Sequence, residues 1–215
     1  MLSFGEWLCV FSGILQAFGY LVYFRTAWRD EIDPNPATWL MFAYDTTLLV
    51  LLHAALGAKP AILFLPTVCA TCSIVVALIG WRRVGFCWPR GGDRAAMLGC
   101  LVLTAAYVGI TGLAAQDLIS GAFRRSADIV LLFSNGSTCV SLVPLLHVLW
   151  RDHAVERPAA WLIWAGAYGF LLASTLLVQG TREAALLVYP VCNIVLHGLV
   201  AWLCRPRRRP VAHGT

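Results

Sequence analysis

Asp45 places a carboxylate inside one of the long apolar segments of this chain, where acidic side chains are rare. A charged group at membrane depth costs at least about 2.5 kcal/mol on insertion scales, so we expect it to face a cavity or a partner. A carboxylate in a cavity can bind a solute or carry a proton. Thr38, Asp45 and His53 follow one another at spacings of seven and eight, close to one helix face. The alternative is a buried polar pair that only locks helices together.

A second polar stripe lies near the end of the chain. Tyr189, Asn193 and His197 recur every four residues and therefore share one helix face. An asparagine side chain both donates and accepts hydrogen bonds, which suits a ligand with hydroxyl or amide groups. A histidine can titrate near neutral pH, although a lone helix histidine is more often a packing residue. Asn135 is a weaker candidate, because hydrogen bonding between helices explains it equally well.

The composition indicates which elements must position these residues. Apolar residues make up 60% of the 215 residues, charged residues make up 13%, and the mean hydropathy is +0.75. A soluble domain of this length has too little interior for that much apolar surface. Segments of about 20 apolar residues are long enough to span a bilayer as helices. We therefore predict an all-α membrane protein with seven transmembrane helices, roughly at 7–24, 38–57, 61–81, 95–115, 129–150, 161–180 and 184–204.

The same residue pattern occurs twice, 122 residues apart. Nine of 22 aligned positions are identical without a gap, and a fixed period of this kind indicates a duplicated structural unit. The repeated residues are Trp28, Arg29, Asp30, Pro36, Ala37, Trp39, Leu40, Ala43 and Leu49, which recur as Trp150, Arg151, Asp152, Pro158, Ala159, Trp161, Leu162, Ala165 and Leu171.

The repeat predicts a 3+1+3 organisation. A unit of three spanning helices ends on the opposite side of the membrane from where it starts, so a second unit joined directly to it would be inverted. One linker helix between the units restores the same orientation, and the two repeats are then parallel. We expect a first triple-helix bundle with its following loop at 1–94, a linker helix and loop at 95–127, and a second triple-helix bundle with a basic tail at 128–215. Parallel repeats in membrane proteins usually place the solute site at their interface, near the midplane.

The positive charges predict the orientation. Twelve of the 16 basic residues lie in the loops 25–37, 82–94 and 151–158 and in the tail after 204. Because positive loops stay in the cytoplasm, the N-terminus should be outside and the C-terminus inside. We expect a multi-pass protein of the bacterial inner membrane. The first apolar segment lacks a basic leader, so we expect a spanning helix and not a cleaved signal peptide. Tryptophans near the segment ends, among them Trp39 and Trp161, fit an interfacial belt.

Other function classes have little support in the sequence. No nucleophile motif, HExxH, P-loop or GxGxxG motif is present, and we expect neither an enzyme nor a cofactor or metal site. The eight cysteines lie largely in apolar segments and are expected to be packing thiols. The excess of basic residues belongs to the membrane-facing loops, so nucleic acid is not an expected partner. The sequence leaves open whether the protein forms a homo-oligomer.

The loops that precede the second helix of each unit carry a family resemblance. They read Asp33-Pro34-Asn35-Pro36-Ala37-Thr38-Trp39 and Glu156-Arg157-Pro158-Ala159-Ala160-Trp161. Together with the 3+1+3 arrangement, a proline followed by a small residue and an aromatic residue resembles the SWEET sugar transporters and the wider PQ-loop superfamily. The Pro-Gln dipeptide itself is absent.

The resemblance implies roles for several of these residues. Pro36, Pro144 and Pro158 look like three of the prolines that form a flexing gate at the cytoplasmic side. Asn193 looks like the substrate-binding asparagine of the second unit, and Cys69 stands at the corresponding position of the first.

Further repeated features suggest moving parts. Pro66 and Pro190 correspond between the units, each a few residues into its helix, where proline removes a backbone hydrogen bond and bends the helix. They are plausible hinges, or they merely shape packing. The tryptophan of each Trp-Arg-Asp triplet would anchor the membrane interface, while Arg29, Asp30, Arg151 and Asp152 could pair across the cytoplasmic mouth as a latch.

The sequence thus predicts an alternating-access transporter or facilitator for a small polar solute such as a sugar or an amino acid. Asp45 is the candidate for coupling transport to protons. A membrane receptor on the same fold, as in the KDEL-receptor branch, and a structural membrane subunit are the alternatives. A resemblance in fold alone does not distinguish a transporter from a receptor or a structural subunit.

Overall fold

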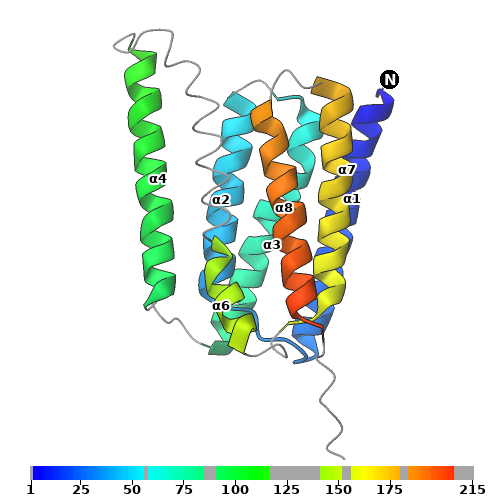
Figure 1. The fold of residues 1–215 in the computed structure, drawn as a ribbon, viewed down its shortest axis with the longest axis vertical. Coiled ribbons are helices and arrows are strands. Elements are labelled where there is room, and N and C mark those ends of the chain that lie inside the picture. Colours follow the sequence, from blue (N-terminus) through cyan, green and yellow to red (C-terminus); the bar gives the residue numbers. More distant parts are fainter. Residues whose placement is uncertain are drawn as a thin grey trace, which may run out of the picture.

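The computed structural model describes residues 2–55, 58–84, 91–116, 141–151, 156–179 and 184–205, and within these ranges all regular structure is helical. Most of the helices stand side by side in one bundle (Figure 1). They are α1 (Phe4–Trp28), α2 (Pro36–Ala55), α3 (Pro60–Val84), α4 (Gly92–Ala115), α6 (Val143–Arg151), α7 (Pro158–Gln179) and α8 (Ala184–Leu203).

The first helix has clear sequence signals at both ends. Ser3 and Glu6 form a capping box, in which the Ser3 hydroxyl accepts from the Glu6 amide at 3.3 Å and the Glu6 carboxylate accepts from the Ser3 amide at 2.8 Å. At the other end, Asp30 adopts a φ of 57°, a left-handed conformation that a continuing helix cannot contain. The chain therefore turns at this point toward α2.

Prolines start three of the helices. Pro36, Pro60 and Pro158 are the first residues of α2, α3 and α7. Proline suits this position because the missing amide hydrogen would have no partner in the helix. Before α2, the side chain of Asn35 accepts from the amides of Ala37 and Thr38 at 3.0 and 3.3 Å, which caps the helix. The repeated prolines Pro36 and Pro158 thus start corresponding helices.

Four of the described helices, α1, α3, α7 and α8, are long and apolar enough to cross a membrane. Several apolar helices of this kind are what a multi-pass membrane protein requires. The helices α2 and α4 cover the second and fourth predicted spans with 20 and 24 residues. Of the fifth predicted span, only α6 is described, and the larger part of 129–150 lies outside the described residues.

The helix order in space differs from the order in sequence. Helix α3 packs against both α1 and α2, and α8 packs against both α7 and α6. The most extensive contact of the bundle joins α1 to α7, and α2 also touches α6. Helix α4 stands at the edge of the bundle, where it contacts α6 and α2 (Figure 1).

The bundle exposes many large apolar side chains and also buries a number of polar ones. Large apolar side chains such as Phe4, Leu21 and Val195 are exposed on its outside. Polar side chains of the helices that are buried inside the bundle include Ser12, Gln16, Thr38, Asp45, Thr46, His53, Ser73, Ser174, Asn193 and His197. An apolar exterior, with the polar side chains of the helices turned toward the interior, is the arrangement expected when lipid is the solvent.

Glycines allow the close approach of α1 and α7. A Cβ added at Gly19 would overlap the indole of Trp164, and one added at Gly5 would lie 2.6 Å from Val178 Cγ2. The indole of Trp164 also donates a hydrogen bond of 3.2 Å to the carbonyl of Gln16. Small residues at helix contacts let backbones come together in a membrane. The central helix contact therefore depends on the missing side chain at Gly19.

We expect Gly19→Ala to lower the free energy of unfolding by about 1–3 kcal/mol, the usual cost of inserting a methyl group into a packed core. The matched control is Gly166→Ala on α7, where the added Cβ would lie at an ordinary 3.8 Å from Leu15 Cδ2. Thermal unfolding in detergent, followed by circular dichroism, compares the two. Equal midpoints for both variants would contradict this account of the interface.

Candidate functional site

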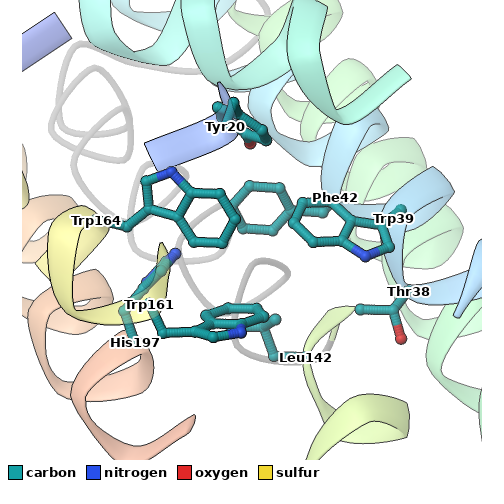
Figure 2. Close-up of a pocket in the computed structure, with 8 residues that line it drawn as sticks. All are labelled: Tyr20, Thr38, Trp39, Phe42, Leu142, Trp161, Trp164 and His197. Carbon is teal, nitrogen blue, oxygen red and sulfur yellow. The ribbon is translucent and has the colours of Figure 1, made fainter. Parts of the chain in front are cut away.

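A small hollow lies where the two repeat units meet, and aromatic rings surround it (Figure 2). In the structure as it stands, it is too narrow to admit a water molecule. The lining residues come from α1, α2, α7, α8 and the residue just before α6: Tyr20, Thr38, Trp39, Phe42, Leu142, Trp161, Trp164 and His197.

Six of the eight lining residues are repeat mates. With the 122-residue spacing, Tyr20 corresponds to Leu142, Trp39 to Trp161, and Phe42 to Trp164. Three positions of the 122-residue repeat are therefore represented by both of their copies in the lining of the hollow.

The rings contact one another at perpendicular or tilted angles. Trp161 and Trp164 are perpendicular, with ring centroids 5.0 Å apart. Tyr20 lies 4.8 Å from Trp164, and His197 lies 5.3 Å from Trp161.

A buried carboxylate borders the hollow where α1 ends and α7 begins. The Tyr23 hydroxyl donates to Glu156 Oε1 at 2.7 Å, and Trp161 Nε1 donates to Oε2 at 3.2 Å. Trp39 Nε1 donates in turn to the Tyr23 hydroxyl at 3.1 Å. Glu156 is only 1% exposed, and burial raises its pKa to about 7, while the two hydrogen bonds partly oppose the rise.

On the opposite side of the hollow, a chain of polar groups crosses the bundle from α1 to α8. Gln16 Nε2 lies 3.0 Å from Cys69 Sγ, and that sulfur lies 3.4 Å from the Tyr168 hydroxyl. The hydroxyls of Tyr168 and Tyr189 are 3.0 Å apart. This chain joins the first unit to the second through side chains that are fully buried.

Several buried polar atoms have no hydrogen-bond partner among the described residues. They are Gln16 Oε1, Thr38 Oγ1, Asn193 Oδ1 and both ring nitrogens of His53. Leaving such an atom unsatisfied costs about 1–3 kcal/mol. These groups come from α1, α2 and α8, and they give the interior an unused capacity to bind hydrogen-bonding groups.

The second predicted stripe lies inside the bundle. Asn193 donates to the carbonyl of Tyr189 at 2.9 Å, and His197 Nδ1 lies 2.8 Å from the Asn193 carbonyl oxygen. Among these residues, only His197 lines the hollow itself. The ring of His53 lies 6.1 Å from that of Tyr189 and approaches the same region from α2.

Asp45 is buried but does not line the hollow. Its carboxylate Oδ2 lies 3.9 Å from Cys100 Sγ of α4. The expected stripe of Thr38, Asp45 and His53 therefore divides: Thr38 lines the hollow, His53 is near Tyr189, and Asp45 is beside α4. Asn135 lies outside the described residues.

The predicted hinge and gate prolines have defined places. Pro66 and Pro190 lie inside α3 and α8, and Pro144 is the second residue of α6. Pro36 and Pro158 begin α2 and α7, beside the Glu156 network. No described contact tests their movement.

The repeated Trp-Arg-Asp triplets lie at the bundle surface. Trp28 and Trp150 are 82% and 69% exposed, as interfacial anchors should be. Asp30 pairs with Arg83 at 2.9 Å, within the first unit. Arg29 is exposed, as is Arg151 at the end of α6, and Asp152 lies outside the described residues. At this end, the described hydrogen bond between the two units joins Tyr23 to Glu156.

Two tryptophans correct the predicted interfacial belt. Trp39 and Trp161 are 3% and 1% exposed, so they belong to the interior and not to a lipid interface. The sequence signal that set these two positions apart was that both copies of the repeat have a tryptophan there. The sequence reasoning also missed Glu156, Tyr23 and Tyr168, because a loop carboxylate and helix tyrosines carry no pattern that distinguishes buried from exposed positions.

Comparisons of this chain with protein-family models, curated proteins and solved structures find no match.

The tyrosine pair at the centre of the polar chain can be tested directly. Tyr168→Phe and Tyr189→Phe should each lower the free energy of unfolding by about 0.5–1.5 kcal/mol. The double variant should lose less than the sum, because both changes remove one shared hydrogen bond. Tyr44→Phe, whose exposed hydroxyl contacts Thr104, is the control and should change little. Strict additivity would show that the two hydroxyls are not coupled.

Proposed function

We propose that the chain is a seven-helix membrane transporter or facilitator, built as a 3+1+3 parallel repeat, that moves a small polar solute by alternating access. The observation that carries the proposal is the hollow lined by three pairs of repeat mates between the units. In repeat-built transporters, the solute binds at the repeat interface and the units rock around it.

The helix contacts support the parallel repeat. Helix α3 is central to the first unit and α8 to the second, and these are the third helices of their units. Between the units, α1 packs extensively against α7, α2 touches α6, and α3 touches α7. If α1 corresponds to α6 and α2 to α7, the contact of α1 with α7 in one unit's frame becomes the contact of α6 with α2 in the other's. A two-fold relation along the membrane normal has this consequence.

The closed hollow supports movement between two states. No water fits between the rings, so a solute can bind only after the units shift. Prolines inside α3 and α8, and at the starts of α2 and α7, are suitable places for such a shift because they interrupt helix hydrogen bonding.

The chemistry of the interior favours an uncharged or zwitterionic solute with several hydrogen-bonding groups, such as a sugar or an amino acid. Ring faces would cover its apolar surface, and Asn193, Gln16 and Thr38 offer free polar atoms. The resemblance to SWEET transporters points to the same class, with Asn193 as the binding asparagine. Within the described residues, no arginine or lysine is buried beside the hollow.

The proposed location, orientation and proton coupling are inferred from the sequence. The protein lies in the bacterial inner membrane with its N-terminus outside, so the end that holds Glu156 and Arg83 faces the cytoplasm. Asp45, buried between α2 and α4, is the proposed site of proton coupling.

The tight packing of the rings also fits a second function, that of a static membrane subunit or receptor in which the interior serves packing alone. Purified protein reconstituted into proteoliposomes separates the two. Saturable uptake from a panel of labelled sugars and amino acids supports the transporter, and its absence in correctly inserted protein supports the alternative.

Asn193→Leu should reduce saturable uptake at least about tenfold, because losing one good hydrogen bond to a bound solute costs about 1.4 kcal/mol. The matched control is Thr67→Ala on α3, since the Thr67 hydroxyl is exposed and bonds only to its own helix at Leu63. Initial rates at subsaturating solute measure the difference. Unchanged uptake by Asn193→Leu would remove this residue from the pathway.

For Asp45, we expect the Asp45→Asn variant to lose uptake driven by a pH gradient while exchange of solute across the membrane continues. Asparagine preserves the shape of the side chain but cannot carry a proton. Proteoliposomes with and without an imposed gradient provide the measurement. Equal gradient-driven uptake by the variant would refute a proton role for Asp45.

A further inference from the structure

The hydrogen bonds around Glu156 join the two repeat units at one end of the bundle. Glu156 and Trp161 belong to the second unit, whereas Tyr23 and Trp39 belong to the first. Both carboxylate oxygens accept a hydrogen bond, one from each unit. Separating the units at this end would break the bond from Tyr23 and expose the carboxylate to water.

The surroundings of Glu156 contain little charge to compensate it. Helix α1 contributes Tyr23, α7 contributes Trp161 with His197 of α8 behind it, and Cys204 faces it from the end of α8. Burial first, and then the Glu156 carboxylate, raise the pKa of the Cys204 thiol. The two ion pairs within the described ranges, Lys59–Glu6 and Arg83–Asp30, both lie in the first unit and leave Glu156 without a basic partner there.

We infer that Glu156 is a proton-binding latch, which takes up one proton when the cytoplasmic end of the pathway closes and releases it when that end opens. This inference rests on the proposed transport function and orientation. It differs from the role proposed for Asp45, because Glu156 would respond to the pH of the cytoplasm and would set the position of the gate.

The direction follows from linkage. In the closed structure, burial raises the pKa of Glu156 to about 7 from an ordinary value of 4.5. Opening would hydrate the carboxylate and restore the ordinary value, so the closed state binds the proton more tightly. With these two values, the ratio of closed to open protein rises about tenfold between about pH 8 and about pH 6.

The same shift affects stability, and its sign is fixed. The folded closed state binds a proton over a range where the unfolded chain does not. The contribution of Glu156 to stability is therefore fully present below about pH 4.5 and is lost as the pH rises through about 7. This readout requires no transport, so it tests the proton site even if no solute is ever moved.

The first arm of the test measures thermal unfolding of the full chain in detergent from about pH 5 to about pH 8. The midpoint of the wild-type protein should fall across this range, and that of Glu156→Gln should lose this fall. Glu31→Gln, which changes an exposed carboxylate in the corresponding loop of the first unit, is the control and should behave like wild type. A fall retained by Glu156→Gln, or absent from wild type, would overturn the inference.

Tyr23→Phe provides a second variant that remains informative if Glu156→Gln does not fold. The hydrogen bond from Tyr23 lowers the pKa of Glu156, so its removal should move the pH-dependent fall to higher pH. A purely structural role for Tyr23 would lower the midpoint equally at every pH, and that result would count against a proton site.

The second arm measures efflux of a transported solute from proteoliposomes that have the same pH, about 6 or about 8, on both sides, so that no gradient acts through Asp45. Wild-type efflux should be slower at the lower pH by up to about tenfold, and Glu156→Gln should show no such difference. The absence of flux in every preparation would defeat the proposed transport function, while the unfolding arm would still decide whether Glu156 binds the proton. Equal pH dependence of efflux in wild type and variant would overturn the latch.

Discussion

The close packing of α1 against α7 is the contact on which the remaining structure depends. It brings the first helix of one repeat unit against the second helix of the other, and it requires that Gly19 have no side chain where Trp164 lies. Lipid supplies no hydrophobic force between helices, so such contacts depend on small residues, packing and hydrogen bonds. The bond from Trp164 to the Gln16 carbonyl adds a directional component.

Once these helices are in contact, the rings of both units must share one space. The repeat places Trp39 opposite Trp161 and Phe42 opposite Trp164, so the densest aromatic packing coincides with the proposed axis. Tight packing at an interface between two similar units favours two discrete arrangements over gradual deformation, because close-packed interiors resist small changes. A transporter on this plan would open by exchanging one packed arrangement for another.

Two buried carboxylates have different surroundings, which suggests different tasks. Asp45 lies beside Cys100 of α4, at the side of the bundle, whereas Glu156 is held by hydrogen bonds from both units at one end. A group that bridges two moving parts is sensitive to their separation. Asp45 instead lies between α2 and the peripheral helix α4. Because both carboxylates are buried, burial does not distinguish their proposed roles, and only the hydrogen-bond partners of each group do.

The sequence by itself determined the helical class and the apolar spans that are described, because hydropathy acts locally. The starts of α2 and α7 lie at Pro36 and Pro158, slightly before the predicted spans. The sequence also placed Asn193 and His197 on a helix face that the structure buries. Only the tertiary structure decided that Trp39 and Trp161 lie inside, that Asp45 turns toward α4, and that Glu156 meets Tyr23 across 133 residues. These outcomes depend on which helix faces meet, and helical periodicity defines a face without naming its partner.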